Sequence, residues 1–402
     1  MEEQFGVLHV VYREEGRSPF VPMVLEPVRQ LRKAGLMAGV LVLSSLGVFL
    51  RRLLNRRKQR AEQSIDETMI KCVPISPSRY KNIGFDRRVA LWATRGAIKN
   101  WRTAVTILHC RGPYSADIGL FIRSQLTNSR IIYDVRGLAW AEQAYGQYNW
   151  PWDEKPPAQL YQEFVRDGER MKAADHVICV SNAMADYVKR HYGLTPAKCT
   201  VLWNATTIRP WEQVLLTRER LREELQLTDK FVLAYSGSIY PRQRFHQGML
   251  LAKALLDRMP SAFLLILTPQ ATRAQEVVRE VEIPLERTRI DTMSHPEVKA
   301  TLPVADIGLI TTGLFEEAHL SNVVCCPIKF AEYLAAGVPV VLAERIGDYS
   351  EVARQHDLGV VLGADESLEH AAARAVSSFT HHDRLLWGRR CYEFASRHLS
   401  SV

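Results

Sequence analysis

The stretch that decides the fold is CCPIKFAEYLAAGVPVV, residues 325–341. Pro327 is placed to open a helix and Gly337 to end it, because proline suits the first helical turn and glycine the position after the last one. Lys329 and Glu332 stand at i and i+3, so both lie on one face near the helix N-terminus. A helix N-terminus favours phosphate, a lysine adds a full positive charge, and a carboxylate accepts from ribose hydroxyls. The segment therefore predicts a site for a nucleotide diphosphate; an amphipathic helix with an incidental Lys–Glu pair is the alternative.

Short apolar or β-branched runs alternate with helical patterns along almost the whole chain. This alternation predicts βαβ units and parallel sheets that are covered on both faces. In the first half we expect strands at 6–12, 37–43, 103–109, 129–134 and 176–181. In the second half we expect strands at 230–237, 262–268, 305–312, 338–343 and 358–363.

A polar, helix-rich stretch at 203–230 separates the two halves. We place the domain boundary near Pro210, between an N-terminal domain of residues 1–209 and a C-terminal domain of residues 210–385. Residues 386–402 are expected to form a last helix that packs back on the N-terminal domain. The predicted fold class is α/β, with two doubly wound parallel-sheet domains facing a central cleft.

Open parallel sheets bind ligands beyond the carboxyl ends of their strands, and YSGSIYPRQR, residues 235–244, occupies such a position. Gly237 permits close approach of the backbone to a ligand. Ser238 offers a hydroxyl, and Arg242 or Arg244 neutralises phosphate charge. An ordinary surface loop is the alternative interpretation.

Polar residues also follow two neighbouring strands of the first half, in HCRG (109–112) and YDVRGLAWAEQ (133–143). Because carboxyl ends of parallel strands meet at one edge, these residues are candidates to surround an acceptor hydroxyl and a phosphate. The candidates are His109, Arg111, Asp134, Arg136 and Glu142. A buried Asp–Arg pair with a structural role is the alternative.

These segments, with 174–193 and 199–207, resemble retaining glycosyltransferases of family 4, which have two Rossmann-like domains in the GT-B architecture. The usual pattern of that family has a glutamate at the position of Val324 as well as at that of Glu332. The departure resembles the subgroup that reads P-x-K-x-x-E-Y. The D-x-R-G string resembles a subgroup that builds bacterial surface polysaccharides.

The resemblance implies transfer of a sugar, with retention, from a nucleotide-diphosphate sugar to a glycan or lipid-linked acceptor. It assigns Lys329, Glu332, Arg242 and Arg244 to catalysis, and it assigns donor binding to Gly237, Ser238, Pro327, Lys329 and Glu332. Arg13, Arg17 and Ser18 are weaker candidates for a phosphate-facing loop. No cofactor and no metal are expected, because the nucleotide sugar is a co-substrate.

The formal net charge is +8, and the run RRLLNRRKQR at 51–60 holds six cations without an acid. We expect residues 47–62 to meet an anionic membrane surface, with a solvated helix face as the alternative. No recognition motif supports a nucleic-acid partner. Seven cysteines without a CxxC spacing, and no His/Cys cluster, indicate neither a disulfide framework nor a metal site.

One uncharged stretch, residues 34–50, is at the lower length limit for a membrane span. Its glycines and serines favour a buried strand that leads into a basic amphipathic helix. The N-terminus has no signal-peptide pattern, so we expect a cytoplasmic protein that is peripheral on the inner face of a membrane.

Two other functions remain open on the sequence. A nucleotide-sugar epimerase or hydrolase of the same architecture would turn over the donor without an acceptor. A noncatalytic component would bind the nucleotide sugar without transferring it, which the missing acid at Val324 leaves open.

Overall fold

The computed structural model describes residues 5–12, 20–47, 49–50, 70–76, 83–145, 156, 158–316 and 319–401. Arg13, Arg17 and Ser18 lie outside the described residues, as does the basic run at 51–60 and most of the membrane-binding segment predicted at 47–62.

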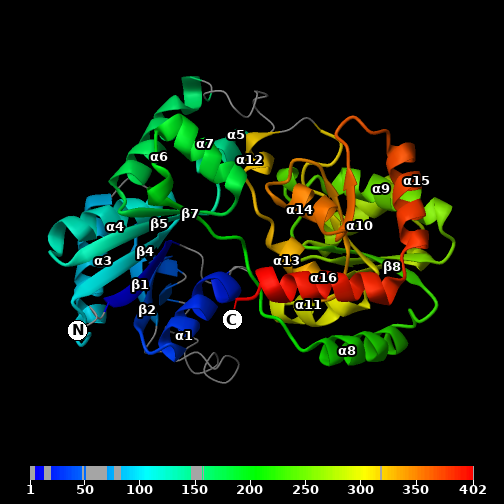
Figure 1. The fold of residues 1–402 in the computed structure, drawn as a ribbon, viewed down its shortest axis with the longest axis horizontal. Helices are drawn as coiled ribbons and strands as arrows, with labels where there is room; N and C mark the ends of the chain where they lie inside the picture. The colour runs from blue at the N-terminus through cyan, green and yellow to red at the C-terminus, as the bar shows by residue number, and fades with distance from the viewer. Residues whose placement is uncertain are drawn as a thin grey trace. The chain divides into compact units, whose positions relative to one another are not determined.

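The chain forms two compact units (Figure 1). The first unit holds Met1–Trp140, Lys155–Val180 and Ala185–Leu202. The second holds Ala141–Glu154, Ser181–Met184 and Trp203–Val402. The chain enters the second unit for the last time at Trp203. The sequence had predicted this boundary a few residues later, after residue 209.

The first unit is built on a seven-stranded sheet in which every strand is parallel to its neighbours. Its strands, in spatial order, are β3 (Ile70–Ile75), β2 (Met37–Ser45), β1 (Phe5–Tyr12), β4 (Val105–Arg111), β5 (Ser129–Val135), β6 (His176–Cys179) and β7 (Cys199–Val201). All five strands expected in this half are present. The sequence pattern did not predict β3 and β7, because β3 contains a lysine and a proline and β7 is only three residues long.

Residues 37–45 form a buried strand, as the sequence favoured. Among the described residues, no helix has the length and apolar character that a membrane crossing requires. The helices of this part of the chain are α1 (Glu26–Lys33), α3 (Ile83–Ile98), α4 (Pro113–Gln125), α5 (Ala139–Ala144), α6 (Tyr161–Ala173) and α7 (Asn182–Tyr192). All residues of β2 between its two ends are buried, as both faces of a parallel sheet require.

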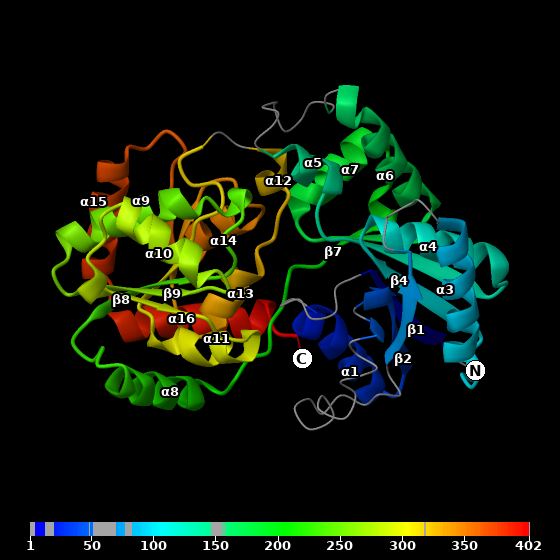
Figure 2. The same cartoon turned by 180° about the vertical axis from the view of Figure 1, so that it is seen from behind.

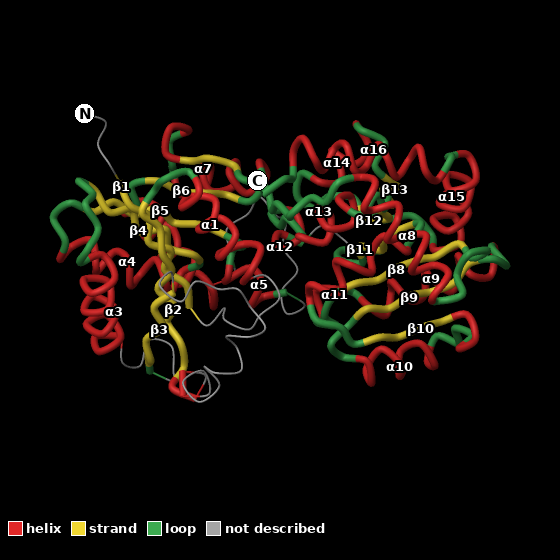
Figure 3. Tube along the Cα trace, turned by 90° about the horizontal axis from the view of Figure 1, so that it is seen from below, coloured by secondary structure: helices red, strands yellow, loops and turns green. Residues whose placement is uncertain are grey.

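The second unit is built on a six-stranded sheet that is also fully parallel. Its strands, in spatial order, are β10 (Thr288–Asp291), β9 (Ala262–Leu267), β8 (Phe231–Ser236), β11 (Ile307–Ile310), β12 (Val340–Ala343) and β13 (Gly359–Leu362). All five expected strands are present, and β10, too short and polar to be recognised, was missed. Figure 3 shows β8, β9 and β10 side by side within this sheet.

Helices cover both faces of the second sheet (Figure 1). They are α8 (Trp211–Glu224), α9 (Phe245–Arg258), α10 (Ala271–Glu280), α11 (His295–Thr301), α12 (Leu320–Val323), α13 (Ile328–Ala335), α14 (Tyr349–Gln355), α15 (Leu368–His381) and α16 (Arg384–His398). The last helix, α16, belongs to the second unit and packs on α13. Its Trp387 is buried and donates to the Asp357 carbonyl at 2.8 Å.

A buried carboxylate ties α8 to the second sheet. Asp306, just before β11, pairs with Arg218 and, at 3.2 Å, with Arg222. The same carboxylate accepts the backbone N–H of Val232 in β8 at 2.7 Å. A third cation, Arg384, lies 3.7 Å from it, and the Asp306 side chain is 0% exposed, so loss of its charge leaves three cations and one backbone donor without this partner.

We predict that Asp306→Ala destabilises the second unit by about 3–5 kcal/mol, the usual cost of breaking a buried pair from one side. The midpoint of urea unfolding measures this change. The matched control is Glu224→Ala on the same helix α8, which removes an exposed pair with Arg220 and changes stability by less than about 0.5 kcal/mol. Equal midpoints for the two variants would contradict the assignment.

Candidate active site

Helix α13 is held against the second sheet by Tyr333. The Tyr333 hydroxyl accepts the N–H of Ser236 at 2.9 Å and donates to the Ala234 carbonyl at 3.1 Å, both in β8. Its ring lies over Gly308 of β11, where a Cβ would come within 2.6 Å of ring carbons. Through Tyr333, helix α13 therefore contacts two central strands of the sheet, β8 and β11.

Both ends of α13 form as the sequence predicted. The helix begins after Pro327, and it ends in a Schellman motif at Gly337, whose φ is +69°. In that motif Gly337 donates to the Leu334 carbonyl and Val338 donates to the Tyr333 carbonyl, both at 3.0 Å. Glycine is required there because other residues are strained at this φ.

Lys329 projects from the first turn of α13 toward the end of β8. Its Nζ donates to Gln243 Oε1 at 2.7 Å and lies 4.7 Å from the centre of the Tyr235 ring. The side chain crosses Gly237, where a Cβ would sit 2.7 Å from Lys329 Cε. Gly237 is thus the residue that lets the lysine reach this place.

Loss of contact with water is the largest influence on the protonation of the Lys329 amine. Burial lowers the pKa of Lys329 to about 7, against the opposing effect of Glu332. A lysine with such a pKa gains a proton when an anion arrives beside it. The environment therefore suits a ligand that brings its own negative charge, such as a phosphate.

The loop after β8 is clamped at both ends. Ile239 N–H donates to Gln270 Oε1 at 2.6 Å, and the Thr311 hydroxyl donates to the Gln243 carbonyl. The Thr312 hydroxyl donates to Gln243 Oε1 at 3.3 Å, so this one amide oxygen receives both Lys329 and Thr312. Gln243 is therefore the link between α13, β11 and the loop.

The two arginines of the loop already have partners within the second unit. Arg244, in the left-handed region with φ of +48°, donates to the Leu314 and Phe315 carbonyls at 3.3 Å and pairs with Glu316 at 3.4 Å. Arg242 pairs with Glu142 at 3.1 Å. A phosphate would have to compete with these carboxylates for either guanidinium.

Glu332 lies one turn after Lys329 and is almost fully buried. Its Oε1 is 2.5 Å from Nε2 of His295, the first residue of α11. Among the described residues, no hydrogen bond joins the other oxygen of this carboxylate to the protein. His295 thus sets the orientation of the carboxylate.

The remaining predicted donor residues lie next to this cluster. The Ser238 carbonyl accepts from the Tyr235 hydroxyl at 2.7 Å, and Pro327 occupies the N-cap of α13. Three polar residues of the cluster were missed from the sequence: Gln243, His295 and Glu316. The amide carries no charge, and the partners of the other two, Glu332 for His295 and Arg244 for Glu316, are distant in sequence, so no local pattern marks them.

In the first unit, the predicted acceptor residues gather around one carboxylate. Asp134 of β5 lies 3.4 Å from His109 Nε2, 3.4 Å from Arg111 and 3.2 Å from Arg136. Parallel register explains the cluster, since Arg111 stands beside Asp134 and His109 stands beside His9, whose ring stacks on it at 4.2 Å. Burial alone raises the pKa of Asp134, but Arg136, His109 and Arg111 hold it well below its usual range.

Glu142, the fifth acceptor candidate, does not join this cluster in the described contacts. It belongs to the second unit, where its carboxylate pairs with Arg242. The other four candidates form an ion-paired group in which Asp134 is compensated. This arrangement matches the structural alternative as well as an anion site.

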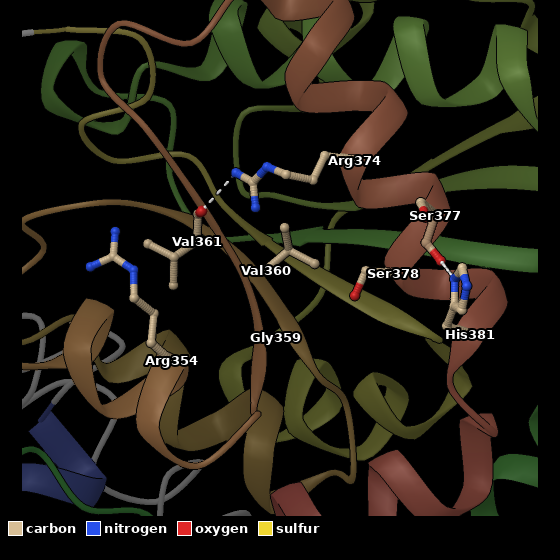
Figure 4. Close-up of a pocket in the computed structure, with 8 residues that line it drawn as sticks. All are labelled: Arg354, Gly359, Val360, Val361, Arg374, Ser377, Ser378 and His381. Carbon is tan, nitrogen blue, oxygen red and sulfur yellow. Dashed lines mark hydrogen bonds between the residues drawn. The ribbon is translucent and has the colours of Figure 1, made fainter.

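A surface hollow of about 500 Å³ lies elsewhere in the second unit, between α14, β13 and α15 (Figure 4). Figure 4 shows Arg374 directed at the Val361 carbonyl, to which it donates at 2.9 Å. The same guanidinium pairs with Glu366 at 2.7 Å, and the lining residues include no carboxylate. Within the described residues, no three His, Cys, Asp or Glu side chains gather in a way that could hold a metal ion.

Comparison with known proteins gives a partial family match and a fold. The family model described as Glycosyltransferase Family 4 matches residues 24–208. Among curated proteins, a search found no sequence match.

Several solved structures share the fold over nearly the whole chain. WaaG, a glycosyltransferase involved in lipopolysaccharide biosynthesis, is 14% identical with a TM-score of 0.65, covering 97% of this chain and 95% of its own. HepE of Anabaena in complex with UDP and glucose is 12% identical with a TM-score of 0.67, covering 98% and 96%. A Listeria monocytogenes protein described as a UDP-N-acetylglucosamine 2-epimerase is 12% identical with a TM-score of 0.56. The match covers 100% of this chain and 93% of that protein.

At these identities the structural likeness shows the fold alone. The family match falls on the half of the chain that holds the Asp134 cluster. Residues 24–208 are thus similar to glycosyltransferase family 4, and the fold of the whole chain is the GT-B architecture.

Proposed function

We propose that this glycosyltransferase moves a sugar, with retention of anomeric configuration, from a nucleotide-diphosphate sugar to a glycan or lipid-linked acceptor. The observation that carries the donor assignment is the buried amine of Lys329, held between Gly237, Gln243 and the Tyr235 ring. HepE, which shares the fold, was solved with UDP-glucose, which supports a donor of this class. The pathway we propose is polysaccharide or glycolipid biosynthesis.

In this proposal the donor diphosphate lies at the first turn of α13 and the loop after β8. Lys329 neutralises the leaving phosphate, and the backbone at Gly237 and Ser238 approaches it closely. Arg242 or Arg244 adds charge once the anion displaces the carboxylate that now holds it. Glu332 accepts from the ribose hydroxyls.

The reaction needs placement and charge stabilisation rather than a protein nucleophile. In retaining transfer of this type the leaving diphosphate stays on the face that the acceptor attacks, and it accepts the acceptor proton. The residues of this chain then supply orientation and a positive field without a metal. On the first unit, His109, Arg111, Asp134 and Arg136 are the proposed acceptor-side group.

The first prediction concerns Lys329→Met, which keeps the stem of the side chain and removes its charge. We expect this variant to lose nucleotide-diphosphate binding and to lower turnover by about a hundredfold or more, since charge stabilisation of a leaving group is worth several kcal/mol. Its thermal midpoint should equal or exceed that of the parent chain, because a buried amine is removed. A thermal-shift screen of nucleotide sugars, followed by transfer assays with the donor found, measures both.

The control is Lys253→Met on α9, a surface lysine that pairs with Asp257. Near-normal binding by Lys329→Met would show that the donor site is wrongly assigned. Turnover of donor by the parent chain without any acceptor would indicate the epimerase or hydrolase alternative. Binding without turnover under any condition would indicate the noncatalytic alternative.

The second prediction concerns pH. The amine of Lys329 is charged in the free protein below its pKa of about 7 and neutral above it. Anion binding favours the charged form, so affinity for a nucleotide diphosphate should fall by up to about tenfold per pH unit above pH 7. Calorimetry in two buffers of different ionisation enthalpy should show uptake of a proton on binding above pH 7. Lys329→Met should show no such uptake, and equal heats for the parent chain in both buffers would contradict the mechanism.

The third prediction concerns the Glu332–His295 pair. Glu332→Gln should weaken binding of a ribonucleotide diphosphate by about tenfold, the value of one charge-assisted hydrogen bond, and should leave the 2′-deoxy analogue less affected. His295→Ala should cause a smaller change in the same direction, because it frees the carboxylate to rotate. His295→Gln, which keeps a donor, should restore part of the affinity. Identical losses for both nucleotides would place Glu332 away from the ribose.

A further inference from the structure

Strand β7 forms one edge of the first sheet, and its first residue is a cysteine. The strand is only three residues long, and among the described strands it pairs with β6 alone. Cys199 is half-buried, whereas Cys179 at the end of β6 is buried. In Figure 2, α7 lies over this end of the first sheet, beside α6. Neither the donor site nor the Asp134 cluster uses these two thiols.

Strand register brings the two thiols to the same face of the sheet. Cys199 stands beside Val177, and Cys179 stands beside Val201. Residues in register, and residues two apart on one strand, point to the same face of a sheet, so Cys179 and Cys199 are diagonal neighbours. Their side chains are hydrogen-bonded to each other. A half-buried thiol and a second thiol within its reach are thus built into one edge of the sheet.

The groups around the pair favour a thiolate at Cys199. The hydrogen bond from Cys179 lowers the pKa of Cys199 to about 7, against the opposing effect of burial and with the help of Lys189 and Lys198. Lys189 comes from α7, and Lys198 comes from the turn before β7. The same hydrogen bond, together with burial and the charge of Asp134, raises the pKa of Cys179 above its usual range. Because the thiolate is the nucleophile in thiol–disulfide exchange, Cys199 is the thiol that attacks first.

We propose that Cys199 and Cys179 form a reversible disulfide by exchange with a small-molecule disulfide such as oxidised glutathione. In the first step, the Cys199 thiolate attacks one sulfur of the small disulfide, forms a mixed disulfide and releases one small thiolate. In the second step, the Cys179 sulfur gives its proton to solvent, attacks the Cys199 sulfur and releases the second small thiolate. The two protein thiols are thereby oxidised, and the small disulfide is reduced to two thiols. The proposal does not depend on the donor chemistry.

The edge position of β7 allows the movement that the new bond requires. Diagonal neighbours are about 7–8 Å apart at Cα and a disulfide spans at most about 6.8 Å, so β7 must approach β6 by about 1 Å. Strand β7 has one neighbouring strand, and a short 3₁₀ turn, Pro196–Lys198, lies immediately before it. A bond formed with such a displacement is reduced more easily than an unstrained one, which favours its reversal by small thiols.

Treatment of the full chain with oxidised glutathione, followed by peptide mapping without reductant, tests the proposal. The parent chain should yield a cross-linked peptide pair that contains Cys179 and Cys199, and its mass should fall by two hydrogen atoms. Cys179→Ser should instead accumulate a glutathione adduct at Cys199, because no second thiol displaces the glutathione. Cys199→Ser should leave Cys179 unmodified.

The matched control is Cys72→Ser, since Cys72 is the half-buried cysteine of β3, the opposite edge strand of the same sheet. This variant should form the cross-link at the rate of the parent chain, and dithiothreitol should return both chains to the reduced mass. A parent chain that stays reduced, or that keeps a stable adduct at Cys199, would overturn the proposal. Equal adduct formation at Cys72 and Cys199 in the Cys179→Ser variant would do the same.

A second readout does not require the disulfide to form. The rate at which iodoacetamide alkylates Cys199 should reach half its maximum near a pH of about 7, against about 8.5 for an ordinary cysteine. Cys179→Ala removes the hydrogen-bond donor and should move this midpoint toward about 8.5, whereas Cys179→Ser keeps a donor and should hold the midpoint low. Equal midpoints for Cys179→Ala and the parent chain would contradict the role of Cys179 in activating Cys199.

Discussion

Every strand in both described sheets runs parallel to its neighbours, and this constraint governs where the chemistry of the molecule lies. A parallel sheet must bury both faces, so its strands are mostly apolar, and most of their polar groups lie toward the strand ends. In the second unit the polar cluster lies at the point where strand order reverses, since Lys329, Gly237 and Thr312 meet beyond β8 and β11. In the first unit Arg111 of β4 and Asp134 of β5 meet one strand further along the sheet.

The Asp134 cluster and the Lys329 cluster differ in how the charge at their centre is compensated. Asp134 is compensated by two arginines and a histidine, so its charge is already stabilised without a ligand. The Lys329 amine faces an amide oxygen and an aromatic ring, and burial depresses its pKa toward neutrality. The first arrangement stabilises a fold and orients its own groups. The second leaves an amine with no carboxylate hydrogen-bonded to it, which is the basis of the donor site proposed above.

Close packing fixes the position of helix α13, which carries Lys329 and Glu332. Tyr333 joins α13 to β8 through two hydrogen bonds and reaches them because Gly308 has no side chain. In the same way, Gly237 leaves room for the side chain of Lys329, because it has no Cβ. Each glycine admits one larger side chain from α13, so the helix carrying Lys329 and Glu332 has one position against the sheet.

Sequence periodicity and turn residues determined all ten expected strands, the ends of α13 and the placement of Lys329 on its first turn. These features depend on neighbours within a few residues, which the sequence displays directly. The strands β3, β7 and β10 were not predicted, because they are strands through pairing with their neighbours and not through their own composition. Only the tertiary structure brought His295 to Glu332, Gln243 to Lys329 and Glu142 to Arg242. These contacts join segments far apart in the chain, and they form only once sheet order and helix packing have set which strand ends meet.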